Sequence, residues 1–315
     1  MNIIQPKVNV IINCFNDDKF LFDAIQSVIN QSYLNWEIIF WDNASTVNIK
    51  SIALSFGDPR IRYHRACKNT PLGEARNMAI AQVDGDYIAF LDSDDLWAKD
   101  KLSKQVEQFQ KNKKAVLVYT DVESFNSSGD VRRLGHYKKF HRGDIFGELL
   151  IDYFLVMSSV MIRAKTYLDN HIHFNERFNM VEECDVFMRM ALYGEVDYID
   201  QVLSYWRVHK NSITWKNYNL ISEESELMIN LLLDEFPRLR EIYNKQLDIK
   251  QSWILRQKIL GFWMSGQGHK ARSAIMKNWK RLSFKVKIFY LVTWFKPRVI
   301  VRWLFYFFGS TVTPG

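Results

Sequence analysis

Residues 87–95 read Tyr-Ile-Ala-Phe-Leu-Asp-Ser-Asp-Asp, an apolar run that ends in three carboxylates within four positions. The apolar part predicts a β-strand, and the acidic part lies where that strand opens into a loop. Carboxylates at the end of a strand can converge on a divalent cation that also takes phosphate oxygens as ligands. The alternative is a turn whose Asp and Ser side chains cap a helix that starts near Lys99. Both interpretations place a strand here and an acidic turn after it.

The segments that precede this strand alternate between strand and helix patterns. Short β-branched or aromatic runs predict strands, and apolar residues at helical spacing predict helices. The order βαβαβαβ predicts an α/β fold, with a mostly parallel sheet flanked by helices and ligands at the carboxyl ends of the strands. The elements placed by their residues are strand 8–12, helix 20–29, strands 36–41 and 61–64, helix 74–81 and strand 87–91, and the strand ends are residues 13–16, 42–45 and 92–95.

The rest of the chain is less regular and ends in helices. Strand patterns vanish from Ser222 onward. We therefore predict an α/β domain over residues 1–216 and a helical region over residues 217–315. The intervening predictions are a helix at 99–111, a strand at 115–121, a turn at 126–129, an apolar strand at 154–162, a helix after Glu182 and a last strand at 202–208.

The composition is that of a globular protein. The 315 residues are 48% hydrophobic and 24% charged, which excludes long disorder, collagen-like repeats and a disulfide scaffold. Three cysteines form no CxxC pair, so we expect a reducing, cytoplasmic setting without a structural zinc site. We see no signal-peptide pattern and no uncharged apolar run of bilayer-spanning length.

The charge is divided unevenly along the chain. No acidic residue follows Asp248, whereas 13 Lys and Arg and 14 aromatic residues do, so residues 1–248 carry a net charge of −6. Basic, aromatic and aliphatic residues together suit helices that lie in the headgroup layer of an anionic membrane. A helical core or dimer contact and a single-stranded nucleic acid are the alternatives, and the many aliphatic residues argue against nucleic acid. We expect a peripheral contact with the inner face of the plasma membrane and no nucleic-acid partner.

Neither a GxGxxG fingerprint after a strand nor a P-loop is present, so a nucleotide would have to be held in another way. Four other motifs occur instead, at residues 10–16 (Val-Ile-Ile-Asn-Cys-Phe-Asn), 37–46 (Glu-Ile-Ile-Phe-Trp-Asp-Asn-Ala-Ser-Thr), 73–79 (Gly-Glu-Ala-Arg-Asn-Met-Ala) and 90–95 (Phe-Leu-Asp-Ser-Asp-Asp). In this order and spacing they closely resemble the inverting glycosyltransferases of family 2, which have the GT-A fold. The resemblance covers residues 7 to about 213.

The resemblance implies a nucleotide site at the strand ends. Asp42 matches an acid that holds the base, and Arg76 matches an arginine that helps to hold the nucleotide. A carboxylate can accept the imide N–H of uracil or thymine, and an arginine fork suits phosphate oxygens. A turn residue at Asp42 and a solvated helix face at Arg76 are the alternatives. The implied nucleotide-binding residues are Asn13, Phe15, Asn16, Asp42, Arg76, Asp92 and Ser93.

A metal site is implied in the same way. Asp92 and Asp94 match the Asp-x-Asp motif that touches the ribose and the metal-bound diphosphate. Residues 206–212 resemble the closing segment of the family, in which a histidine, here His209, reaches the metal or the diphosphate. The resemblance thus implies Mn²⁺ or Mg²⁺ at Asp94 and His209, and the alternative for His209 is an ordinary surface residue.

A second acidic cluster, Glu182-Glu183-Cys184-Asp185, precedes a helical pattern. It resembles the Glu-Asp motif of the family, whose second acid is the general base. That position is Glu183, a Glu where the family usually has Asp, so Asp185 is the reserve candidate and Glu182 completes the catalytic set. The alternative is a group of acids that favour a helix amino terminus through its dipole.

The resemblance implies an enzyme that moves a sugar, with inversion, from a UDP- or dTDP-linked donor to an acceptor hydroxyl. The expected acceptor is a glycan or lipid-linked glycan of bacterial surface polysaccharide synthesis. A catalytically silent sugar-nucleotide-binding membrane scaffold and a nucleotidyltransferase remain as alternatives. Donor turnover separates the first from an enzyme, and release of pyrophosphate identifies the second.

Overall fold

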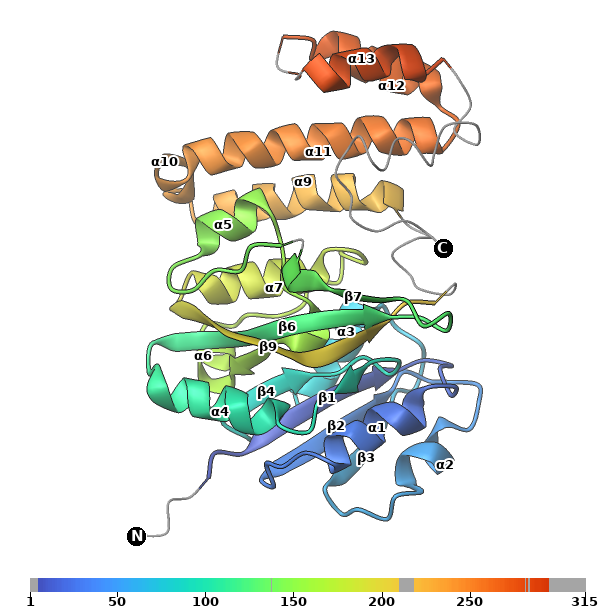
Figure 1. Cartoon of the computed structure of the whole chain (residues 1–315), viewed down its shortest axis with the longest axis vertical. Coiled ribbons are helices and arrows are strands. Elements are labelled where there is room, and N and C mark those ends of the chain that lie inside the picture. Colours follow the sequence, from blue (N-terminus) through green and yellow to red (C-terminus); the bar gives the residue numbers. More distant parts are fainter. Residues whose placement is uncertain (1–4, 137, 210–217, 281, 283, 295–315) are drawn as a thin grey trace. The chain divides into compact units, whose positions relative to one another are not determined.

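Four parallel strands form one half of a single sheet (Figure 1). They are β1 (Val8–Cys14), β2 (Trp36–Asp42), β3 (Ile61–Arg65) and β4 (Tyr87–Phe90), and the helices between them are α1 (Leu21–Ile29), α2 (Ile49–Leu54) and α3 (Leu72–Ile80). The predicted βαβαβαβ order of the first ninety residues is therefore confirmed.

The computed structural model describes residues 5–136, 138–209, 218–280, 282 and 284–294. The chain divides into two compact units, Met1–Ser212 and Ile213–Gly315. The predicted domain boundary at residues 216 and 217 falls outside the described residues.

The other half of the sheet is mixed. The strand order is β3-β2-β1-β4-β8-β6-β9-β5, with β7 paired to β6. Strand β8 runs antiparallel to both β4 and β6, whereas β9 runs parallel to β6. The remaining elements of this unit are β5 (Leu96–Trp97), α4 (Lys101–Lys111), β6 (Ala115–Phe125), β7 (Val131–Arg133), α5 (Phe146–Ile151), β8 (Met161–Arg163), α6 (Ala164–Asp169), α7 (Glu182–Ala191) and β9 (Glu195–Arg207).

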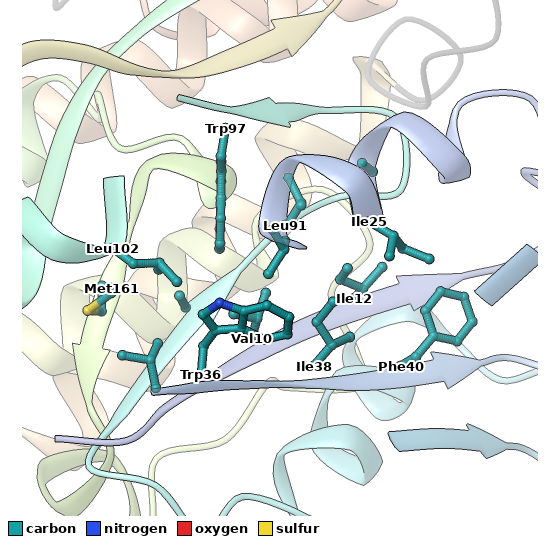
Figure 2. Packing of buried hydrophobic residues seen from close by; sticks show 14 of the residues in the cluster. Val10, Ile12, Ile25, Trp36, Ile38, Phe40, Leu91, Trp97, Leu102 and Met161 are labelled. Carbon is teal, nitrogen blue, oxygen red and sulfur yellow. The ribbon is translucent and has the colours of Figure 1, made fainter. Parts of the chain in front are cut away.

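Strand alternation assigns the two faces of the sheet. Val10 and Ile12 of β1 and Ile38 of β2 belong to one core cluster with Ile25 of α1 (Figure 2). Because neighbouring strand residues point to opposite faces, Asn13 lies on the other face, which α3 covers. Because β1 runs parallel to β2 and β4, the loops that follow these three strands lie at the same edge of the sheet.

One predicted strand is wrong over most of its length. Residues 154–162 were expected to form an apolar strand, but a short 3₁₀ turn occupies Met157–Ser159 and the strand β8 begins only at Met161. The segment is buried as its composition requires, yet Ser158 and Ser159 use their polar groups in side-chain and loop hydrogen bonds. A short apolar run indicates burial, and it does not distinguish a strand from a buried loop.

The described residues of the second unit are mostly helical. Helix α11 packs against α9 and α12, and α12 packs against α13. A small core joins Trp263 of α11, Ile275 of α12 and Phe289 of α13. The helices are α9 (Tyr218–Glu235), α10 (Leu239–Ile242), α11 (Asn244–Met264), α12 (Gly268–Lys277) and α13 (Phe284–Val292).

Within the described ranges, no helix combines the length and the apolar character that crossing a bilayer requires. The part of the basic and aromatic segment from residue 295 onward lies outside those ranges.

Candidate active site

The acidic turn after β4 is held in place by Asp95. This side chain is 1% exposed, and its carboxylate accepts hydrogen bonds from Ser158 Oγ at 2.6 Å and from the Arg207 backbone N–H at 2.9 Å. Burial raises the pKa of Asp95 well above its ordinary value, and the charges of Asp92 and Asp94 raise it further. Asp95, the last acid of the run at residues 92–95, and Ser158 were not among the site residues expected from the sequence.

The turn and the end of β9 meet at Asp94. Nε2 of His209 lies 2.8 Å from Asp94 Oδ2, and Nε of Arg207 donates to the Asp94 carbonyl oxygen at 2.8 Å. The structure thus brings together Asp94 and His209, the two metal ligands that the family resemblance implied. Burial raises the pKa of the Asp94 carboxyl, and the charge of Asp92 raises it further.

Asp94 and His209 suit a divalent cation chemically, since carboxylate oxygen and imidazole nitrogen are both ligands of Mn²⁺. No group of three or more His, Cys, Asp or Glu side chains is arranged to hold a metal within the described part of the chain. Two protein ligands leave most coordination positions to other oxygen atoms, which agrees with a metal held partly by substrate phosphates. The donor set therefore fits the implied metal.

Arg76 connects the two acidic motifs. Its side chain on α3 is only 4% exposed, with Nη1 2.9 Å from Glu182 Oε1 and Nη2 3.3 Å from Asp92 Oδ1. Although burial opposes the charged form, the charges of Asp92, Glu182 and Glu183 raise the pKa of Arg76. Arg76 therefore does not lie on a solvated helix face, the alternative considered from the sequence.

The three acids at the start of α7 have different surroundings. Glu182 is buried against Arg76, and Asp185 is buried with Arg189 Nε donating to its Oδ1 at 3.0 Å. The Glu183 carboxylate makes no hydrogen bond or ion pair with the described residues, and part of its side chain remains accessible to solvent.

The position of Glu183 also changes its affinity for protons. Burial raises the pKa of Glu183 to about 8; Arg76 opposes this change, and the charges of Glu182 and Asp92 add to it. A carboxylate that makes no hydrogen bond or ion pair and titrates near neutral pH has the properties of a general base.

The loops after β1 and β2 are joined by side chains. The backbone N–H of Asn16 donates to Ser45 Oγ at 3.0 Å, and the Thr46 N–H donates to Asn16 Oδ1 at 2.7 Å. Asn16 has a positive φ of 56°, a conformation that asparagine tolerates better than most residues. Phe15 is 47% exposed beside this junction.

Asp42 is fully buried at the end of β2. Its carboxylate accepts hydrogen bonds from Tyr63 Oη at 2.5 Å, from the Ser45 N–H at 2.7 Å and from the Arg65 guanidinium. Burial opposes ionisation, but these three donors hold the pKa of Asp42 below its ordinary value. Tyr63 and Arg65 were not selected from the sequence, because no pattern in β3 marks them.

The remaining implied nucleotide-binding residues lie close to these loops in the fold. Asn13 is at the end of β1, and its Nδ2 is buried without a hydrogen-bond partner. Ser93 Oγ donates to Asp17 Oδ2 at 2.8 Å, which ties the acidic turn to the segment before α1.

Comparison with known sequences identifies the family. The family model described as "Glycosyl transferase family 2" matches residues 9–172. An uncharacterized glycosyltransferase of Rickettsia conorii is 31% identical over 268 residues, covering 79% of this chain and 44% of the relative. The Escherichia coli protein WfgD, named UDP-Glc:alpha-D-GlcNAc-diphosphoundecaprenol beta-1,3-glucosyltransferase, is 34% identical over 124 residues, covering 39% of this chain and 49% of the relative. The chain spans less than half the length of the first curated relatives it matches.

Solved structures share the fold. The S. aureus protein TarS, residues 1–349 in complex with UDP-GlcNAc, has a TM-score of 0.61 and 17% sequence identity, covering 90% of this chain and 91% of TarS 1–349. The mannosyltransferase PcManGT of Pyrobaculum calidifontis, in complex with GDP-Man and Mn²⁺, has a TM-score of 0.61 and 15% identity, covering 97% and 86% of the two chains. These matches confirm the predicted GT-A fold class. The four motifs, the mixed sheet and the family match agree, and the chain belongs to glycosyl transferase family 2.

Proposed function

We propose that this protein is an inverting glycosyltransferase that uses a UDP- or dTDP-linked sugar as donor. The observation that carries the proposal is Glu183, a partly exposed residue with an unpaired carboxylate within electrostatic reach of Arg76 and Asp92, which are paired to each other. A base at this place can remove the proton of an acceptor hydroxyl while that oxygen attacks the anomeric carbon. A single in-line displacement of this kind inverts the configuration at that carbon.

The donor would lie along the loops at the carboxyl ends of β1, β2 and β4. Asp42 would accept the imide N–H of the base, although three protein donors already occupy its oxygens. Arg65 is about half exposed and is the donor most able to move aside. Phe15, exposed at the same edge, offers a ring face to the base.

The diphosphate would lie near Asp94 and His209. These two side chains would hold Mn²⁺ or Mg²⁺, and the bound ion would offset the charge that develops on the departing diphosphate. The Mn²⁺ complex of the related mannosyltransferase supports the choice of ion. Arg207 keeps Asp94 and His209 on facing segments through its bond to the Asp94 carbonyl oxygen.

Glu183 is assigned as the base in preference to Asp185. The carboxylate of Asp185 is 1% exposed and is paired to Arg189, so it has little access to a substrate hydroxyl. Glu182 forms an ion pair with Arg76 and would orient the Arg76 guanidinium. Glu183 would take the acceptor proton as the bond from the anomeric carbon to the leaving diphosphate oxygen breaks.

The proposal is tested with a panel of nucleotide sugars in the presence of Mn²⁺. A ligand at about 100 times its dissociation constant should stabilise the protein by about 2.7 kcal/mol, which a thermal-shift measurement detects. Release of nucleoside diphosphate from the stabilising donor supports a glycosyltransferase. Release of pyrophosphate would identify a nucleotidyltransferase, and binding without turnover would identify a silent scaffold.

The proposed acceptor is a lipid-linked glycan at the cytoplasmic face of the membrane. The name of WfgD, with its diphosphoundecaprenol acceptor, supports this class of acceptor. Helix α13 supports it independently, because Phe284, Ile288 and Leu291 form a stripe at helical spacing with exposed fractions of 77%, 40% and 65%. Its opposite side packs into the core of the helical unit through Val286 and Phe289.

The partner that best fits this stripe is an anionic lipid surface. The stripe is accompanied by cations and by no acid, since Asp248 is the last acidic residue of the chain. Lys287 lies beside it, with Nζ 5.4 Å from the centre of the Trp279 ring. Basic residues near an anionic surface contribute about 1 kcal/mol each, and buried apolar side chains add a contribution that salt does not remove.

A further inference from the structure

Phe20 directly precedes helix α1 and is not among the site residues that the family resemblance implied. Its carbonyl oxygen accepts a hydrogen bond from the Ala24 N–H at 3.1 Å, within the first turn of the helix. The next residue, Leu21, is fully buried in the same core cluster as Ile25. The backbone of Phe20 therefore has a fixed place at the end of the loop that follows β1.

The partly exposed ring of Phe20 contacts two side chains at the end of β9. Cζ of the Arg207 guanidinium lies 4.1 Å from the centre of the ring. The centre of the His209 ring lies 5.7 Å away, with the two ring planes tilted by 48°. A guanidinium at this distance is attracted by the face of an aromatic ring. One aromatic side chain thus contacts both Arg207 and the proposed metal ligand His209.

A second ring, that of Phe125, contacts the same guanidinium. Its centre lies 4.6 Å from Cζ of Arg207, and its carbonyl oxygen accepts a hydrogen bond from the Val208 N–H at 2.8 Å. Phe125 ends β6, whereas Phe20 precedes α1, so the two rings come from segments far apart in the sequence. Only 16% of the Arg207 side chain is exposed. The two rings therefore restrict the orientation of the guanidinium.

Arg207 transmits this orientation to the proposed metal ligands. Its backbone N–H donates to Asp95 Oδ1 at 2.9 Å, and its Nε donates to the Asp94 carbonyl oxygen at 2.8 Å. His209 follows two residues later, with Nε2 2.8 Å from Asp94 Oδ2. The segments that carry the two ligands are thus joined through Arg207, and Phe20 contacts Arg207 and the imidazole directly.

The two ligands need such support because their side chains are not enclosed. Asp94 and His209 keep 25% and 26% of their side-chain surface exposed. Side chains that are partly exposed retain rotational freedom, which a binding site must remove before it can hold an ion. Neighbours that orient metal ligands are worth about 10- to 100-fold in metal affinity.

We propose that Phe20 is a positioning residue for the Asp94–His209 pair. The inference rests on the proposed function, in which these two side chains hold Mn²⁺ or Mg²⁺. The ring of Phe20 holds the Arg207 guanidinium and the His209 imidazole, so that the two ligands face each other. Phe20 acts through these neighbours. A ring that served only the packing of α1 would affect stability and leave the affinity for the ion unchanged.

The test measures Mn²⁺ affinity of the full-length protein at saturating UDP, from the electron paramagnetic resonance signal of the free ion. Phe20→Leu removes the ring and keeps an apolar side chain, whereas Phe20→Tyr keeps the ring. Phe22→Leu is a control that removes a nearby ring stacked on Phe56. Lys19→Met is a second control, because Nζ of Lys19 also lies 4.7 Å from the centre of the Phe20 ring. Calorimetry gives the UDP affinity of each protein without metal.

We expect Phe20→Leu to weaken Mn²⁺ binding about tenfold without a change in metal-free UDP affinity. Phe20→Tyr and both controls should bind Mn²⁺ like the wild type. Wild-type Mn²⁺ affinity in Phe20→Leu, or an equal loss in Phe22→Leu, would overturn the inference.

The failure of the proposed metal site gives a different result. In that case the wild type binds no Mn²⁺ at saturating UDP, or Asp94→Ala binds the ion as tightly as the wild type does. Either result would refute the metal site together with the role of Phe20. Loss of Mn²⁺ binding in Asp94→Ala with wild-type affinity in Phe20→Leu would refute the role of Phe20 alone.

Discussion

Replacing Glu183 by glutamine should stop turnover and make the protein more stable at alkaline pH. Glutamine keeps the shape of the side chain and cannot accept a proton. The loss of a general base typically lowers the rate by about 10²–10⁴, equivalent to about 3–5 kcal/mol in activation free energy. Donor affinity should remain, because Arg76 and Asp92 hold each other independently of Glu183.

The stability effect follows from the pKa of Glu183, about 8 in the folded protein against 4.5 for an ordinary glutamate. Because the folded state keeps a proton that the unfolded chain releases, the free energy of unfolding falls as the pH rises from 4.5 through 8. At 1.36 kcal/mol per pKa unit this interval corresponds to about 5 kcal/mol as an upper bound. Partial exposure of Glu183 reduces the effect, so we expect a gain of about 1–3 kcal/mol for the variant at pH 9 and none at pH 4.

Three measurements check this reasoning. Thermal melts of wild type and Glu183→Gln between pH 4 and 9 should diverge as the pH rises. The wild-type kcat/KM should increase with pH along a limb whose midpoint lies near 8, since that profile reports the free enzyme. Calorimetric titration with UDP should give similar affinities for both proteins.

The matched control for Glu183→Gln is Asp185→Asn, which removes the carboxylate charge that faces Arg189. This variant should lose stability through that pair. Near-normal turnover of Glu183→Gln together with collapse of turnover in Asp185→Asn would refute our assignment of the base. Parallel melting curves at all pH values would refute the electrostatic argument.

Three further changes test the other parts of the proposal. Asp94→Ala should weaken metal-dependent donor binding at least about tenfold, equivalent to about 1.4 kcal/mol, while metal-free UDP binding persists. Calorimetry with and without Mn²⁺ measures both affinities. An unchanged metal dependence would contradict the metal site. Arg65→Ala removes one of the two donors to Asp42 Oδ2, so uridine affinity should be equal or higher. A loss of affinity would mean that Arg65 itself contacts the nucleotide. Phe284→Ser combined with Leu291→Ser should lower sedimentation with anionic vesicles at least about tenfold. The control Ile242→Ser, at an exposed position on α10, should sediment like the wild type. Equal sedimentation of the wild type, the double variant and the control would argue against α13 as the contact.

Local sequence patterns were sufficient to predict the strands and helices of the parallel half of the sheet. Strands β1, β2 and β4 are short β-branched or aromatic runs, and helix α1 repeats apolar residues at helical spacing. Such patterns act within a few residues of each other, so they can be read without knowing the fold. The strand predicted at residues 154–162 was wrong because a local pattern shows only that the segment is buried. Its loop geometry depends on distant partners such as Asp95.

The site shows the same division between local pattern and tertiary arrangement. By itself the sequence determined the family, the order of the elements and the position of the acids at strand and helix ends, because turn and motif chemistry is local. Only the tertiary structure decided which acid is free: Arg76 reaches Glu182 across 106 positions, and His209 reaches Asp94 across 115. Those contacts depend on how β9 and α7 pack against β6 in the mixed half of the sheet. They leave Glu183 unpaired because the nearest cation is already occupied by its neighbour.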